Sequence, residues 1–250
     1  MVKLRLDVAL APSDIQSNLT KKISIVVDVL RASSTITALL GKGCSKVFPV
    51  STIDEAYFFK KKKGYLIAGE RNGITLPDFD FGNSPIDLEQ INVKGKNVIL
   101  TTTNGTKVIR KLMDSEKVFI GCLLNAGACI TKVLSLFYKQ SLNDIYIVCA
   151  GNKGKFALDD AICAGYLVET ICRLTAPQQD SLIITDAAVA VRQIYRSYPD
   201  ILSGFKESTS GQILIDLSCY DDIHYCAEID VYNCVPVLNK NDVEPYFQNY

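Results

Sequence analysis

The sequence has 250 residues, 48% of them hydrophobic, and its 27 basic residues balance 27 acidic ones. This is enough apolar material for a buried core. A chain without net charge has no summed field that attracts polyanions, so we expect no nucleic-acid partner. No apolar run approaches the roughly 18 residues of a membrane span, so we expect no membrane partner.

Short β-branched runs alternate with helical patterns along most of the chain. An alternating apolar and charged run over 3–10 predicts a first strand at the edge of a sheet. Further strands are predicted over 23–29, 46–50, 65–68, 97–101, 118–120 and 145–148. Helices are predicted between most of them, over 34–40, 53–62, 106–113, 126–138 and 158–172. The alternation indicates an α/β fold with a largely parallel sheet covered on both faces.

The remainder of the chain is mostly helical in pattern, with helices predicted over 186–198 and 212–217. A last strand is predicted over 234–238, and Pro236 marks it as an edge strand. The basic run 60–63 before Gly64 is interpreted as the last turn of a helix that ends at glycine. We find no linker or repeat, so residues 1–250 are predicted to form a single domain.

The nine cysteines include no CxxC pair, and several lie inside apolar runs. Arg5 and Asp7 interrupt the apolar start of the chain, unlike the core of a signal peptide. We therefore predict buried free thiols and a cytoplasmic protein.

Polar residues and glycines follow five of the predicted strands. In a parallel sheet such loops share one edge, where open α/β folds bind ligands. These loops supply the candidate site residues Asp28, Arg31, Glu70, Arg71, Thr103, Asn104, Gly105, Asn125 and Gly151.

Among these loops, the run Thr101–Thr106 is the most specific signal of a binding site. A strand leading through Asn104 and Gly105 into a helix exposes N–H groups and hydroxyls suited to phosphate. The alternative is an N-cap that satisfies its own helix. Arg31 and Arg71 either bind an anion bidentately or form ordinary ion pairs with neighbouring acids.

Asp159 and Asp160 both begin the helix predicted over 158–172, where carboxylates complement the helix dipole. At about 100° per residue, Asp160 falls on the apolar face and Asp159 on the mixed face. A buried carboxylate needs a partner, and a hard cation is a suitable one. We therefore predict that Asp160 is functional and that Asp159 is a solvated helix starter.

The chain contains one histidine, His224, which is far in sequence from the polar loops. A histidine triad or a histidine-rich zinc site is thus poorly supported. Carboxylates and a metal-bound water remain for acid and base chemistry, which indicates metal-assisted hydrolysis. We predict Asp28, Glu70 and Asp160 as catalytic residues and as ligands of Mg²⁺.

Five segments resemble, in order, the signature segments of the 2-phosphosulfolactate phosphatases. They are VVDVLRASSTITALLGKG, AGERNGITLPDFDFGNSP, ILTTTNGTKVI, GCLLNAGA and IVCAGNKGKFALDDAICAGY. The resemblance implies a three-layer α/β/α fold and a Mg²⁺-dependent phosphatase that converts 2-phospho-3-sulfolactate to 3-sulfolactate, a step toward coenzyme M. It adds Asn83 to the candidate pocket, which already contains Asp28, Arg31, Glu70, Arg71, Thr103, Asn104, Gly105, Asn125, Gly151 and Asp160.

This sequence departs from the family pattern at two places. Position 159 is glutamate in many members and aspartate here, and Asn72-Gly73 stands where two glycines are common. Three alternatives stay open: another small phosphate monoester as substrate, a non-catalytic anion-binding protein, and Asp28 as a covalent nucleophile. The oligomeric state is also open, with a homodimer among the options.

Overall fold

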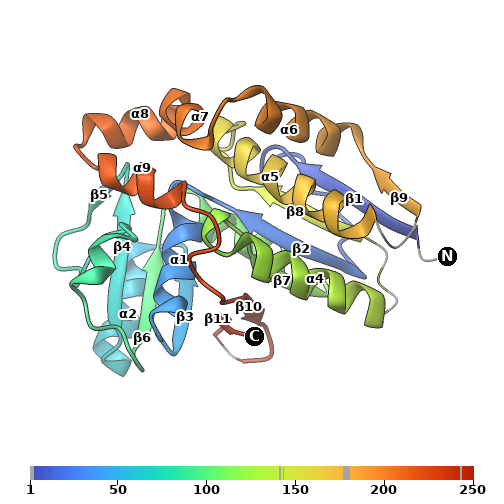
Figure 1. Cartoon of the computed structure of the whole chain (residues 1–250). Helices are drawn as coiled ribbons and strands as arrows, with labels where there is room; N and C mark the ends of the chain where they lie inside the picture. The colour runs from blue at the N-terminus through green and yellow to red at the C-terminus, as the bar shows by residue number, and fades with distance from the viewer. Residues whose placement is uncertain (1–2, 141, 143, 177–180, 243) are drawn as a thin grey trace.

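The computed structural model describes residues 3–140, 142, 144–176, 181–242 and 244–250. Among these residues, one sheet has the strand order β5-β4-β6-β3-β11-β10-β7-β2-β8-β1-β9 (Figure 1). Its strands are β1 (Lys3–Ala9), β2 (Lys22–Val27), β3 (Lys46–Val50), β4 (Leu66–Arg71), β5 (Ile74–Thr75), β6 (Asn97–Thr101), β7 (Lys117–Ile120), β8 (Asp144–Cys149), β9 (Ser181–Ile184), β10 (Pro236–Asn239) and β11 (Tyr246–Asn249).

The helices cover both faces of this sheet, which confirms the three-layer α/β/α fold. They are α1 (Ala32–Gly41), α2 (Ile53–Lys63), η1 (Asp87–Glu89), α3 (Gly105–Lys111), η2 (Leu123–Asn125), α4 (Ala126–Gln140), α5 (Leu158–Thr175), α6 (Asp186–Ser197), α7 (Ile201–Glu207), α8 (Thr209–Asp216) and α9 (Tyr220–Cys226). None of the described helices is both long and apolar enough to span a membrane.

The sheet consists of two parallel groups joined by an antiparallel hairpin. Strands β4, β6 and β3 form one group, and β7, β2, β8, β1 and β9 form the other. The hairpin β10–β11 pairs with each group at one position, Val237 with Phe119 and Phe247 with Val47. Because the hairpin pairs antiparallel with both groups, the sheet is mixed but largely parallel, as predicted.

Two predicted edge strands are not at an edge. Strand β1 lies between β8 and β9, so β9 is the edge on that side. Strand β10 lies between β11 and β7. Pro236 is tolerated there because it is the first residue of its strand, where a missing N–H costs least.

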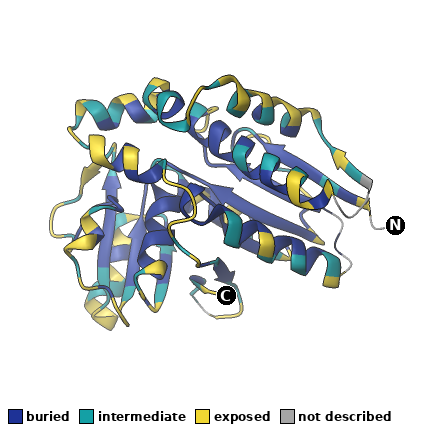
Figure 2. Ribbon diagram, viewed as in Figure 1, coloured by how far each residue is buried: buried dark blue, intermediate teal, exposed yellow. Residues whose placement is uncertain are grey.

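Successive side chains of a strand lie on opposite faces of the sheet, so they pack against different helix layers. In β6, Val98 and Leu100 pack in the cluster that contains α1 and α3 residues, whereas Ile99 packs with Ala56 of α2. Strands β2 and β8 are buried along their whole length (Figure 2). Helices α4 and α5 cover one face of these two strands. Near-continuous apolar runs of this kind are typical of strands in parallel sheets.

The local signals in the sequence are largely confirmed. Helix α2 begins at a capping box made by Thr52 and Glu55, and it ends at Gly64, whose φ is 64°. Its last turn is the basic run 60–63. All nine cysteines are free thiols, and seven of them are buried.

The C-terminal helices α7, α8 and α9 lie near the carboxyl ends of β4 and β8 (Figure 1). Of these three, only the second half of α8 was predicted. The strands β5, β9 and β11 were not predicted either.

Candidate active site

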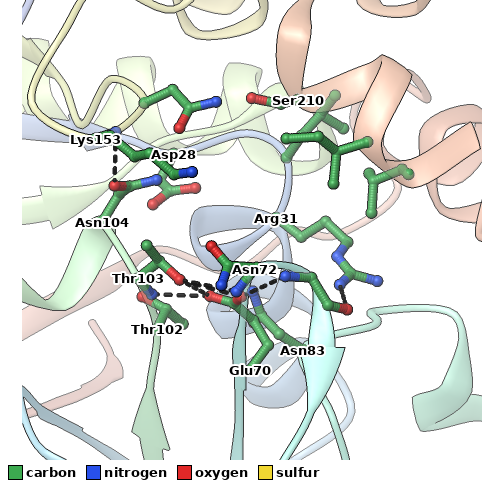
Figure 3. A pocket seen from close by; sticks show the side chains of 15 residues that line it. Asp28, Arg31, Glu70, Asn72, Asn83, Thr102, Thr103, Asn104, Lys153 and Ser210 are labelled. Atoms are coloured by element: carbon green, nitrogen blue, oxygen red, sulfur yellow. Dashed lines mark hydrogen bonds between the residues drawn. The ribbon is translucent and has the colours of Figure 1, made fainter. Parts of the chain in front are cut away.

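One pocket lies where the carboxyl ends of the two parallel groups meet. Its walls come from the loops after β2, β4, β6 and β8, together with helix α8. Figure 3 shows Asp28, Asn104 and Lys153 on one side, with Arg31 and Ser210 opposite them. The lining residues are Asp28, Leu30, Arg31, Glu70, Asn72, Gly73, Asn83, Thr102, Thr103, Asn104, Asn152, Lys153, Ser210, Ile213 and Leu214.

Asp28 follows β2 directly and is 8% exposed. Its Oδ1 accepts the N–H of Ala32, at the start of α1, at 3.3 Å. Burial raises the pKa of Asp28 from 3.8 to about 7; the charges of Asp159 and Glu70 add to this, while N–H donors of Ala32 and Gly105 oppose it. A carboxyl group in this range can hold or release a proton near neutral pH.

Gly105 brings helix α3 against Asp28. A Cβ at this position would lie 2.7 Å from Oδ2 of Asp28 and 2.9 Å from Cβ of Ala32. Such contacts are too short unless a neighbour moves, so a side chain at this position would displace the carboxylate of Asp28 or the side chain of Ala32.

Asp159 is buried, contrary to the prediction of a solvated helix starter. It is 2% exposed, and its Oδ1 has no hydrogen-bond partner. Burial raises the pKa of Asp159 to about 6, and the hydroxyls of Ser210 and Ser208 act in the opposite direction. The helical phase was misleading because α8 covers the side of α5 that the sequence pattern assigned to solvent.

Asp160 is also buried, but both of its oxygens are used. Oδ1 accepts the N–H of Val29 at 2.9 Å, and Oδ2 accepts the N–H of Gly151 at 2.8 Å. Burial raises the pKa of Asp160, and the negative charges of Asp159 and Asp28 act in the same direction. Asp160 therefore ties the loop after β2 to the loop after β8.

Gly151 is constrained by its backbone. Its φ is +67°, and a Cβ there would lie 2.2 Å from the carbonyl oxygen of Lys155. Only glycine fits this turn. Gly151 itself does not line the pocket, but the turn presents Asn152 and Lys153 to it.

Glu70 plays the same tying role between the loops after β4 and β6. Its carboxylate accepts the N–H of Gly73 at 2.7 Å and the N–H of Thr103 at 2.8 Å. The hydroxyl of Thr103 donates to it as well, at 3.0 Å. The donors of Thr103 are therefore directed at Glu70 (Figure 3), and the phosphate cradle predicted for this loop is partly used internally.

The two predicted arginines have different positions. Arg31 lines the pocket and is 5% exposed. Arg71 is not among the lining residues, since its guanidinium donates to the carbonyl of Glu70 at 2.7 Å and to Oγ1 of Thr101 at 3.0 Å. The structure thus brings one of the two arginines to the pocket.

The predicted asparagines also differ. Asn83 lines the pocket and is 4% exposed, with an unpartnered Oδ1. Asn104 lines it too, and its Oδ1 accepts the N–H of Lys153 at 3.1 Å. Asn125 does not line the pocket. Its amide oxygen accepts the N–H of Cys122, and its amide nitrogen donates to the carbonyls of Ile120 and Cys234.

Several pocket residues were not predicted from the sequence. Lys153 and Asn152 belong to a Gly-Asn-Lys-Gly turn, whose sequence is only a weak signal of anion binding. Ser210, Ile213 and Leu214 reach the pocket from α8, whose amphipathic pattern is that of an ordinary surface helix. Only the packing of α8 over the loops reveals these last three.

No three His, Cys, Asp or Glu side chains in the described part of the chain gather closely enough to hold a metal ion alone. Two of the three predicted ligands, Glu70 and Asp160, already accept backbone N–H groups, and the predicted trio stays a prediction. Mg²⁺ needs fewer protein ligands, since it commonly uses one or two carboxylates, waters and substrate phosphate oxygens. Asp28 and Asp159 supply two buried carboxylates, one with an unpartnered oxygen, and this donor set fits Mg²⁺.

Comparison with known proteins agrees with the resemblance. A family model described as 2-phosphosulpholactate phosphatase matches residues 9–241. A protein of Clostridium novyi (strain NT) named "Probable 2-phosphosulfolactate phosphatase" is 35% identical over 236 residues, which cover 93% of this chain and 96% of that protein. Proteins with the same name are 35% identical in Clostridium acetobutylicum, covering 96% of this chain and all of that protein, and 36% identical in Caldanaerobacter subterraneus, covering 93% and 94%.

Proposed function

The chain belongs to the 2-phosphosulfolactate phosphatase family, and from this premise we propose that it hydrolyses 2-phospho-3-sulfolactate to 3-sulfolactate and phosphate with bound Mg²⁺. The observation that carries the proposal is the pair of buried carboxylates Asp28 and Asp159, beside a pocket that also presents Arg31 and Lys153. A phosphate ester carries several negative charges, so carboxylates next to its site would by themselves oppose its binding.

A divalent cation would compensate for the negative charge of these carboxylates. Arg31 is already neutralised by an ion pair with Asp222, and Lys153 is the other cationic residue of the lining. Two carboxylates without a cation would repel a phosphate ester. Mg²⁺ held by these carboxylates would supply positive charge to offset that of the phosphate and would activate a water for attack on it.

The residues of the chain have separable roles in this proposal. Asp28 and Asp159 would hold Mg²⁺ by their carboxylate oxygens, in place of the trio expected from the sequence. Arg31 lines the pocket and has N–H groups beyond those that it donates to Asp222 and Gly73, and Asn83 offers an unpartnered amide oxygen to a hydroxyl or water. Leu30, Ile213 and Leu214 form an apolar wall that limits access of water to the ester.

A phosphate-release assay on metal-free protein tests the proposal. We expect no release of phosphate from 2-phospho-3-sulfolactate in excess EDTA and full release when Mg²⁺ is restored. Full activity without bound metal would overturn the metal-dependent mechanism. Activity on another phosphate monoester, with none on this one, would move the substrate assignment, and binding of phosphate without turnover of any ester would favour the non-catalytic alternative.

A further inference from the structure

The guanidinium of Arg31 is held on two sides before any ligand is present. One terminal nitrogen pairs with Oδ2 of Asp222, and the other donates to the carbonyl of Gly73 at 3.0 Å. Arg31 and Asp222 are 5% and 2% exposed. Since a guanidinium has five N–H donors, N–H groups remain for the pocket that Arg31 lines.

Asp222 belongs to α9, in a part of the chain without a functional motif in its sequence. Its Oδ1 accepts the hydroxyl of Ser84 at 2.7 Å, and the oxygen of that hydroxyl accepts the N–H of Asp87 at 3.3 Å. Both carboxylate oxygens therefore have partners. A buried ion pair with such additional hydrogen bonds fixes the direction of the arginine.

The same residues hold the C-terminal helices over the pocket. A Cβ at Gly73 would lie 2.6 Å from Leu217, which directly follows α8. Arg31 thus contacts α9 through Asp222. It also contacts Gly73, which lies next to Leu217 at the end of α8. Arg31, α9 and the end of α8 therefore lie together at one side of the pocket.

The ion pair also changes what Arg31 contributes. Because Asp222 offsets its charge at contact distance, Arg31 offers directed N–H donors more than long-range attraction for an anion. Loss of Asp222 should therefore misplace these donors.

Building on the proposed function, we infer that Asp222 is a positioning residue of the active site. It acts through Arg31 by fixing the guanidinium against the phosphate ester, and it makes α9 a necessary part of the site.

A double-mutant cycle with Arg31→Ala and Asp222→Ala tests this inference. We expect Asp222→Ala to lower kcat/KM about 10- to 100-fold, as removal of a group that orients a primary contact commonly does. In the Arg31→Ala background the same substitution should cost nothing further. Asp221→Ala, the same charge change at an exposed neighbour on α9, is the matched control and should leave activity unchanged. Equal losses from Asp222→Ala in both backgrounds would overturn the inference.

Chemical rescue provides a readout that a purely structural role would not change. Guanidinium ion added to Arg31→Ala should restore part of the activity by occupying the vacated site beside Asp222. It should not rescue the double variant, and equal rescue of both would contradict the inference. If Asp222→Ala does not fold, Asp222→Asn replaces it in the same cycle.

Failure of the proposed function is distinguishable from failure of this inference. Wild-type protein that releases no phosphate from any ester would remove the proposed function. The cycle is then measured on the affinity for inorganic phosphate by calorimetry, where non-additive losses support the positioning role and additive losses overturn it.

Discussion

Asp159 and Asp160 begin helix α5 side by side, but their carboxylates have different partners. Asp160 accepts two backbone N–H groups, whereas one oxygen of Asp159 has no partner. A buried carboxylate oxygen without a partner is costly unless a cation binds it. This contrast favours Asp159 as a Mg²⁺ ligand and Asp160 as a tie between two loops.

Substitution by asparagine should separate the two roles. Asp159→Asn should weaken Mg²⁺ binding and phosphate release by at least about tenfold, with the melting temperature of the metal-free protein unchanged or higher. Asp160→Asn leaves a backbone N–H facing an amide group, so it should lower the free energy of unfolding by about 1–3 kcal/mol. Calorimetric Mg²⁺ titration and thermal melts on both variants provide the measurement. Equal loss of Mg²⁺ affinity in the two would contradict this division.

Lys153 differs from Arg31 because its side chain is exposed and no carboxylate among the described residues pairs with it. We expect Lys153→Gln to raise KM for the phosphate ester by about 3- to 10-fold with little change in kcat, as for loss of one exposed charge contact. The dependence of kcat/KM on salt should weaken at the same time. Lys155→Gln, the same change on the same turn outside the pocket, should alter neither. Steady-state kinetics at two salt concentrations would show whether the two variants differ as expected.

At the scale of elements, the start of α3 sets the position of Asp28. Gly105→Ala should leave the helix as stable or more stable, because alanine is the better helix former by about 1 kcal/mol. The added Cβ would nevertheless collide with Oδ2 of Asp28. We therefore expect loss of Mg²⁺ affinity and of kcat/KM without a fall in melting temperature, measured against Lys107→Ala on the exposed side of the same helix. A fully active Gly105→Ala variant would show that Asp28 can shift without consequence.

The alternation of strands and helices over residues 23–172 was predictable because its strands are buried on both faces. Strands such as β2 and β8 read as apolar runs, and helices such as α2 carry their own capping signals. The short strands β5, β9 and β11 lack such a signal. Their pairing depends on contacts with distant parts of the chain, which a local pattern does not contain.

The candidate site was predictable only in part for a related reason. Loops that follow strands could be recognised, and Asp28, Arg31, Glu70, Thr103 and Asn104 do line one pocket. A helical wheel assumes one buried side, so it could not anticipate that α8 covers Asp159. Nor could it show that backbone N–H groups already occupy Asp160. Roles that depend on the direction of a carboxylate require the packed structure.

At the scale of the whole molecule, the sheet and the C-terminal helices bury several acids at one place. Burial raises the pKa of Asp28 to about 7 and that of Asp159 to about 6, from 3.8. Between pH 4 and 7 the folded protein therefore retains protons that the unfolded chain has lost. Because the folded state binds more protons there, its free energy of unfolding must fall as the pH rises. Glu169 does not oppose this trend above pH 5, since Arg192 and Arg196 lower its pKa to about 2.

We therefore expect metal-free protein to be less stable at pH 8 than at pH 5.5, by on the order of a few kcal/mol, since one pKa unit corresponds to about 1.4 kcal/mol. Asp28→Asn should flatten this slope, because it removes the group with the pKa of about 7. Saturating Mg²⁺ should reverse the slope for wild type, because the cation binds the deprotonated carboxylates and stabilises the folded state most at high pH. Denaturant unfolding of both proteins across this pH range, in EDTA and in Mg²⁺, gives the four curves. A metal-free wild type whose stability rises from pH 5.5 to 8 would mean that these carboxylates are ionised without a cation, and the electrostatic case for Mg²⁺ at Asp28 and Asp159 would fail.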